Sequence, residues 1–189
     1  MGIDGYPVYL RNHSLINIEY DKVILSGDMG QLFMGELTWD KLNVRWKRLE
    51  GTRSSTRSKY LIFKMKEYVY MVGGYRQYSN GCSHGPQFSW MYPTEVKPTV
   101  SCEKYNLRTK KWSICKHSLG SPLINASVVV SPDESFAVIT GGLKEINKYL
   151  TPNIKPMNRI IIFEEETGFT KLGDRMLRRR SDHVSIVIK

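Results

Sequence analysis

The hydrophobic positions in the middle of the chain form short runs that end at glycines or polar turns. The run YVYMV ends at Gly73 and Gly74, and a later alternating run, TVSCEKY, leads through a turn to Trp112. Neither run has helical spacing. Glycine permits the positive φ angles and the close backbone approach found at strand ends. This pattern predicts antiparallel strands, so we expect an all-β protein.

Two similar stretches flank the central one. Upstream, VILS ends at Gly27 and the following segment ends at Trp46; downstream, FAVIT ends at Gly141 and Gly142, and the following segment ends at Phe169. A further strand is expected after each aromatic residue, anchored at His13, Tyr60, Asn125 and His183.

The spacing between these landmarks indicates a repeat. Each aromatic residue precedes the next anchor by 14, 13 and 14 residues, and each anchor precedes its glycine by 14, 13 and 16. Only the interval from glycine to aromatic residue varies, at 19, 39 and 28 residues, so insertions collect there. A two-sheet sandwich could use the same strands, but it would not explain the repeated spacing.

The repeat predicts four strands in each unit. The predicted strands are 14–18, 22–25, 33–38 and 45–49, then 60–65, 68–72, 99–105 and 112–114, then 126–130, 136–140, 159–163 and 169–172, and finally 184–188. The units extend over about 13–59, 60–124 and 125–182, and the final strand lies in 183–189. The continuous apolar runs VVV and VSIVI predict strands that are buried on both faces.

At these residues the chain resembles the kelch repeat, in which a unit of about 50 residues forms one four-stranded blade of a β-propeller. The kelch pattern combines an Arg-x-x-His strand, a strand ending in Gly-Gly, a tyrosine-bearing strand and a strand with tryptophan. The matching residues are Gly73, Gly74, Tyr105, Trp112, Arg180 and His183. Asp28, Phe163 and Phe169 depart from the pattern, because they stand where it has glycine, tyrosine and tryptophan. The Arg-x-x-His element also departs: Arg57 is followed by Tyr60, and Pro122 with Asn125 keeps little of it.

The resemblance implies a partial kelch-type propeller of about three four-stranded antiparallel blades with one extra inner strand. Propellers close with about four to eight blades. We therefore expect a fragment of a larger propeller, or a chain that another chain completes. An open array would leave an unpaired strand edge.

The resemblance also implies a non-enzymatic protein–protein interaction module, with no catalytic residues, cofactors or metal. Many kelch proteins recognise substrates as ubiquitin-ligase adaptors, which is one role to expect here. The alternatives are an enzyme of the kelch-like propeller class, an oxidase or a sugar-modifying enzyme, and a basic nucleic-acid-associated protein. The sequence has no P-loop, GxSxG elbow, dinucleotide fingerprint or HExxH helix.

Charge and loop placement predict where a partner binds. A net charge of +10 favours an acidic protein surface or peptide as the partner. Nucleic acid is a less expected partner, because no recognised nucleic-acid module accompanies the arginine run near the C-terminus. In a meander of four strands, the variable intervals and the loops between units share one end. We expect basic and aromatic residues at that end to bind the partner. These residues are Arg57, Arg76, Tyr78, Trp90, Tyr92, Arg178, Arg179 and Arg180.

The three cysteines, Cys82, Cys102 and Cys115, are an odd number in a chain whose start lacks a signal-peptide pattern. Reduced thiols and a cytoplasmic location are expected, with the nucleus as the alternative. No apolar run approaches the roughly 18 residues of a membrane span. Two Cys-x-His pairs, completed by His84 and His117, offer four zinc ligands. The usual Cys-x-x-Cys and His-x3-5-His spacing of zinc sites is absent, so we expect no metal.

Overall fold

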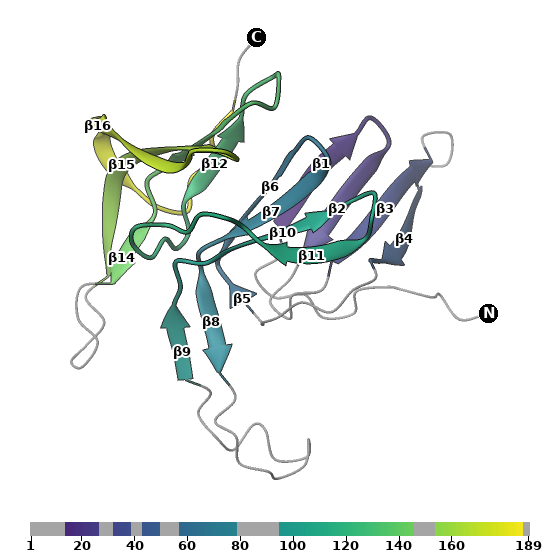
Figure 1. Ribbon diagram of the computed structural model, residues 1–189, viewed down its shortest axis with the longest axis horizontal. Helices are drawn as coiled ribbons and strands as arrows, with labels where there is room; N and C mark the ends of the chain where they lie inside the picture. The colour runs from purple at the N-terminus through teal and green to yellow at the C-terminus, as the bar shows by residue number, and fades with distance from the viewer. Residues whose placement is uncertain are drawn as a thin grey trace.

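The described residues fold into four antiparallel sheets and contain no helix (Figure 1). The expectation of an all-β protein is confirmed. The structure, a computed structural model, describes residues 14–26, 32–38, 43–49, 57–78, 95–145 and 154–186.

Three sheets follow one another along the chain, and each is a meander of neighbouring strands. Sheet 1 contains β1 (Ser14–Glu19), β2 (Lys22–Ser26), β3 (Leu32–Thr38) and β4 (Asn43–Arg48). Sheet 2 contains β6 (Leu61–Met65), β7 (Tyr68–Val72), β10 (Cys102–Asn106) and β11 (Lys111–Ile114). Sheet 3 contains β12 (Ser127–Val130), β13 (Ala137–Thr140), β15 (Ile154–Glu164) and β16 (Gly168–Arg180).

Two shorter additions extend this arrangement. In sheet 3, β14 (Leu143–Glu145) pairs with the beginning of β15. A small three-stranded sheet has the order β5-β8-β9 and consists of β5 (Arg57–Ser58), β8 (Tyr75–Tyr78) and β9 (Glu95–Pro98). Both additions follow the second strand of their unit, where the sequence predicts insertions.

The three main sheets share one strand register. In each sheet, four residues that lie directly opposite one another form a row across the strands. The rows are Asn17, Val23, Gly35 and Trp46 in sheet 1; Lys64, Val69, Tyr105 and Trp112 in sheet 2; and Val130, Ala137, Phe163 and Phe169 in sheet 3. Trp46, Trp112 and Phe169 therefore occupy equivalent positions.

The third position of this row determines how the aromatic residue packs. Trp112 faces the Tyr105 ring at a centroid distance of 5.2 Å, and Phe169 faces Phe163 at 4.6 Å. Sheet 1 has Gly35 there, and a Cβ at that position would lie 2.7 Å from the Trp46 ring. The indole in sheet 1 thus fills space that a second ring occupies in the other sheets.

The glycine pairs end β7 and β13 in the same way, with positive φ at all four residues. The first glycine of each pair donates its N–H to the third strand, as in Gly73 to Ser101 O at 3.1 Å and Gly141 to Arg159 O at 2.9 Å. The second glycine donates to the chain that enters the next unit, at Leu123 O (2.7 Å) and Arg180 O (2.9 Å) respectively. Gly27 lies outside the described residues.

The hydrogen bonds between units correct one predicted anchor. Lys59, Asn125 and Asp182 all have positive φ, and they form a series in which Asn125 N–H donates to Lys59 O and Asp182 N–H donates to Asn125 O. Ala126, rather than Asn125, is therefore equivalent to Tyr60 and His183. With this change, the spacing from aromatic residue to anchor becomes 14 in every unit.

One strand prediction at the C-terminal end is wrong, and another is too short. Of the predicted strand 184–188, residues 184–186 form no strand, because no second strand among the described residues pairs with them, and the rest lies outside those residues. The predicted strand 169–172 is the start of a longer one, β16, with 13 residues. β16 is long because β15 continues past the sheet into its pairing with β14, and β16 follows β15 as far as Met157.

In the part of the chain that the structure describes, two hydrophobic cores hold the three sheets face to face. The core between sheets 1 and 2 contains Ile24, Leu32, Tyr60, Ile62, Val69, Met71 and Tyr105. The core between sheets 2 and 3 contains Leu61, Phe63, Tyr70, Val72, Leu123, Ala137, Ile139, Ile161 and Phe163, among others. Sheet 2 is thus buried on both faces. The VVV run at 128–130 is only half-buried, because sheet 3 has a neighbouring sheet on one side.

Cys102 and Cys115 form a disulfide, so the expectation of reduced thiols is wrong for these two residues. Their Cα atoms lie 5.3 Å apart because β10 and β11 are adjacent and Cys115 N–H donates to Cys102 O at 3.0 Å. Disulfides persist mainly in oxidising compartments. The disulfide therefore does not favour a cytoplasmic location. That location stays a prediction. Cys82 lies outside the described residues.

Candidate functional site

Two hairpins project beyond the glycine pairs, and they begin at equivalent positions. β8 starts directly after Gly74 and pairs with β9, whereas β14 starts directly after Gly142 and pairs with β15. Both hairpins close with the same bond, since Thr99 N–H donates to Gly74 O at 2.9 Å and Met157 N–H donates to Gly142 O at 2.8 Å. Figure 1 shows both on the same side of the sheets. We call this side the hairpin end.

Cationic residues occupy opposite register positions in both hairpins of this end. In the first, Arg76 lies opposite Lys97; in the second, Lys144 lies opposite Lys155. The two pairs are equivalent, because Arg76 and Lys144 each come two residues after the second glycine of their pair. The hairpin end therefore carries the same pairing of cationic positions in both hairpins.

The arginine run lies at the base of the second hairpin. The sequence predicts Arg178, Arg179 and Arg180 in a loop between units, but they form the exposed end of β16. Arg180 lies opposite Met157, at the point where β15 leaves sheet 3 for its pairing with β14. The three arginines thus add positive charge to the hairpin end.

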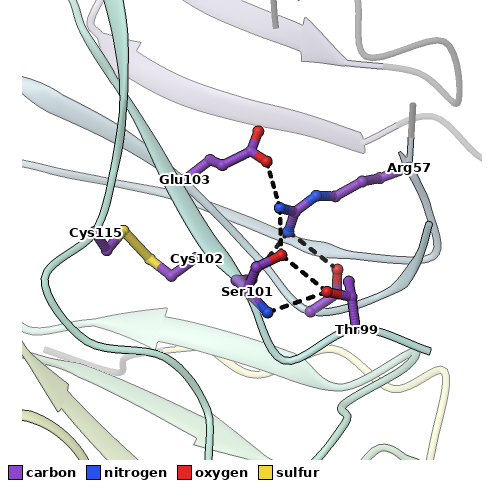
Figure 2. Close-up of polar contacts among 7 residues, drawn as sticks. Arg57, Thr99, Ser101, Cys102, Glu103 and Cys115 are labelled. Atoms are coloured by element: carbon purple, nitrogen blue, oxygen red, sulfur yellow. Dashed lines mark hydrogen bonds and ion pairs between the residues drawn. A yellow bond between two sulfur atoms is a disulfide. The ribbon is translucent and has the colours of Figure 1, made fainter. Parts of the chain in front are cut away.

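Arg57 does not belong to the exposed face, so its prediction as a partner-binding residue is wrong. Its side chain is fully buried, and Nη2 forms a 2.6 Å ion pair with Glu103. Figure 2 shows the guanidinium inserted between Glu103 and Ser101. It donates to Ser101 O at 2.9 Å and to Ser101 Oγ at 2.6 Å, and Thr99 Oγ1 in turn contacts Ser101 Oγ at 2.8 Å. The buried charge is compensated by these partners, as burial requires.

This network connects β5 to the third strand of sheet 2. Arg57 lies opposite Arg76 on the first hairpin, so its contacts with β10 fix the base of that hairpin. In sheet 3, Arg159 occupies the position of Ser101 and donates to Ser121 Oγ at 2.7 Å and Pro122 O at 2.9 Å. Burial lowers the pKa of Arg159. Near the base of each hairpin, an arginine thus donates hydrogen bonds to loop atoms.

The remaining predicted site residues divide into two groups. Arg76 and Tyr78 lie on β8, within the first hairpin. Trp90 and Tyr92 lie outside the described residues. Lys97 is not among the residues predicted from the sequence, because its position opposite Arg76 depends on where the insertion begins and ends as a strand. Only the register of the folded hairpin reveals that pair.

A cavity of about 160 Å³ lies between sheets 2 and 3, on the disulfide side. Its polar groups already pair with one another: Lys104 Nζ contacts Glu165 at 2.5 Å, and His117 Nε2 contacts Glu166 O at 2.9 Å. Burial, and then the nearby carboxylate of Glu165, raises the pKa of Tyr70, which lines the cavity. The cavity belongs to the contact between the two sheets, and we assign no ligand to it.

The zinc ligands considered from the sequence are not brought together where the structure describes them. Cys115 is in the disulfide, and the pair Cys82 and His84 lies outside the described residues. Among the residues described, no group of three or more His, Cys, Asp or Glu side chains is placed to hold a metal ion. That part of the chain also has no helix with the length and apolar character needed to cross a membrane.

Comparison with known proteins finds a similar fold but no family. No protein-family model and no curated protein sequence matches the chain. Among solved structures 131 chains match, so this arrangement of sheets recurs in other proteins. The structure of YjhT is similar to it with a TM-score of 0.65 and 14% sequence identity, over 95% of this chain and 56% of that one. At this identity the likeness concerns the fold alone, and the chain spans about half the length of YjhT.

Proposed function

We propose that this chain is a non-enzymatic interaction module of kelch type, whose three sheets are blades of a larger β-propeller and whose hairpin end binds an acidic protein surface. The shared register of the three sheets supports the repeat. The likeness to about half of a longer solved chain supports a larger assembly. A ubiquitin-ligase adaptor is one role in which such a module would recognise a substrate.

One observation carries the binding proposal. Two hairpins that start at equivalent positions both place two cations opposite each other, and the arginine run lies at the base of the second. A partner that supplies carboxylates would suit this end, because arginine in particular forms strong, bidentate hydrogen bonds with them. The net charge of +10 would also speed the approach of an acidic partner.

Affinity capture with charge-reversed variants tests this proposal. Arg76→Glu and Arg179→Glu change the hairpin end, and Lys111→Glu changes an exposed cation at the opposite end of sheet 2. We expect the wild-type chain and the Lys111 variant to retain the same partner, and the other two variants to lose it. Binding should also weaken as salt rises, since exposed charges are screened over about 8 to 10 Å at physiological ionic strength.

Trp90→Ala extends the test to the insertion between β8 and β9. We expect this variant mainly to dissociate faster, because a buried aromatic contact affects the dissociation rate more than the association rate. Loss of the partner by the Lys111 variant, together with its retention by the Arg76 and Arg179 variants, would place the binding surface elsewhere.

A further inference from the structure

The disulfide of sheet 2 joins two positions that sheet 1 holds together without a covalent bond. By strand register, Cys102 and Cys115 are equivalent to Leu32 and Leu49. The same hydrogen bond closes both pairs, because Cys115 N–H donates to Cys102 O at 3.0 Å and Leu49 N–H donates to Leu32 O at 2.9 Å. In each sheet the first residue is buried in a hydrophobic core and the second packs against it. These positions therefore need two apolar side chains, but no bond between them.

The reduced cysteines can meet the same requirement. A free thiol packs as a small apolar side chain. Further contacts hold the segment after Cys115 in place, since Leu119 N–H donates to Val100 O at 2.9 Å and His117 Nε2 lies 2.9 Å from Glu166 O. Neither contact depends on the disulfide. We therefore expect the fold to persist when the disulfide is reduced.

The disulfide is also separate from the buried network of Arg57. Neighbouring side chains on a strand point to opposite faces, so Cys102 points away from the face of β10 that carries Ser101 and Glu103. Figure 2 shows the two sulfur atoms on the far side of β10 from the guanidinium. Breaking the disulfide would leave the ion pair between Arg57 and Glu103 in place.

The two sulfur-bearing side chains differ in their access to solvent. Cys102 is 1% exposed, whereas Cys115 is half-buried and lines the cavity between sheets 2 and 3. Lys116, on the wall of the same cavity, is exposed. Thiol–disulfide exchange depends on which sulfur atom an attacking thiolate can reach. A thiol in solution should therefore reach Cys115 and not Cys102.

We propose that Cys102 and Cys115 are a reversible redox pair that is oxidised and reduced in the folded chain, and that small thiols such as glutathione exchange with it at Cys115. The thiolate of glutathione attacks Cys115 Sγ, the bond to Cys102 breaks, and Cys102 leaves as a thiolate that takes a proton from water. A second glutathione thiolate attacks the glutathione sulfur of this mixed disulfide. Cys115 leaves as a thiolate, which is protonated, and oxidised glutathione is released. Oxidised glutathione re-forms the bond by the reverse steps.

This chemistry makes Cys115 a modification site and does not depend on the binding proposed for the hairpin end. It also fits the expected cytoplasmic location, because disulfides that form in a reducing compartment are usually transient and often redox-sensing. A permanent structural disulfide would instead resist reduction until the chain unfolds.

A glutathione titration of the full chain tests reversibility. The chain is equilibrated at several ratios of reduced to oxidised glutathione, free thiols are blocked with N-ethylmaleimide, and peptide mass spectrometry measures the fraction of disulfide. We expect the same curve from the oxidised and from the reduced starting material, without denaturant. Circular dichroism should show the same β spectrum for both forms, and both should unfold cooperatively in urea.

The rates of thiol blocking and two matched variants locate the reactive sulfur. In the reduced wild type, Cys115 should react with N-ethylmaleimide about tenfold faster than Cys102 or more, because access controls the rate. With oxidised glutathione, Cys102→Ser should gain one glutathione at Cys115, whereas Cys115→Ser should gain little at Cys102. Peptide mapping separates both sites from Cys82.

A variant that copies sheet 1 is the control for folding. Cys102→Leu combined with Cys115→Leu should fold, and dithiothreitol should leave its urea midpoint unchanged, whereas the wild-type midpoint should fall. Three outcomes would overturn the inference: reduction of the wild type only after urea is added, loss of the folded spectrum on reduction, or equal blocking rates at the two cysteines. All three are measured on the wild type, so a serine variant that does not fold leaves the test complete.

Discussion

At the scale of single residues, the fold depends most on positions where two backbones come close. Gly73 combines a φ of 67° with an N–H bond to the third strand of its own sheet. A Cβ at this position would lie 2.5 Å from the backbone oxygen of Leu123, which cannot move without disturbing the entry into the next unit. Gly73 is thus required both by its conformation and by its neighbour.

The first prediction compares this glycine with one in open space. We expect Gly73→Ala to lower the free energy of unfolding by roughly 1 to 3 kcal/mol, from the left-handed conformation and the close contact. Gly173→Ala is the control, because a Cβ there would meet nothing within 4 Å. Urea denaturation measures both variants. Equal midpoints for the two would show that Gly73 has no special structural role.

At the scale of elements, equivalent positions in two sheets use different chemistry for the same contact. Arg57 and Glu103 form a buried ion pair in sheet 2. Their equivalents in sheet 3, Leu123 and Ile161, are buried together in a hydrophobic core. Burying a charge pair is often no more stabilising than an apolar pair of similar size, but breaking it is costly.

A double-mutant cycle tests this equivalence. We expect Glu103→Ile alone to cost roughly 3 kcal/mol, because it leaves the buried guanidinium without its carboxylate. Arg57→Leu combined with Glu103→Ile should recover most of that loss, since the pair then matches sheet 3. Urea unfolding of the wild type, both single variants and the double variant gives the coupling energy. A double variant whose loss equals the sum of the single losses would contradict the prediction.

At the scale of the whole molecule, the three sheets differ in how many faces they bury. Sheet 2 contributes to both hydrophobic cores, whereas sheets 1 and 3 each contribute to one. Leu15 on β1 and Val184, which follows β16, are both exposed. Within the described residues, the stack therefore has a buried central sheet and two less buried outer sheets.

Hydrogen exchange should reveal this gradient. We expect the amide protons of β7 and β10 to exchange most slowly, because opening them disrupts both cores, and those of β1 and β12 to exchange faster. Mass spectrometry of deuterated peptides, with intrinsic rates subtracted, measures the difference. Slower exchange in β1 than in β7 would show that sheet 1 is covered in solution.

The all-β class and most strands followed from the sequence alone, because alternation, glycine turns and aromatic spacing are local signals. The strand 68–72 coincides with β7, for example. One anchor was misplaced by a residue, since Asn125 and Ala126 can be distinguished only through the hydrogen bonds of Lys59 and Asp182. The kelch resemblance and its propeller remain proposals.

Only the tertiary structure decided which side chains of the candidate site are buried and which of them meet. Arg57 was expected at the surface, like any arginine in a polar stretch. It is buried instead, because its guanidinium donates to the carboxylate of Glu103 on β10, which lies 46 residues away in the sequence. The pair Arg76 and Lys97 likewise depends on the register across the insertion. A sequence determines which segments extend as strands, because that preference is local. Which charges meet depends on contacts between distant segments, and these exist only in the folded chain.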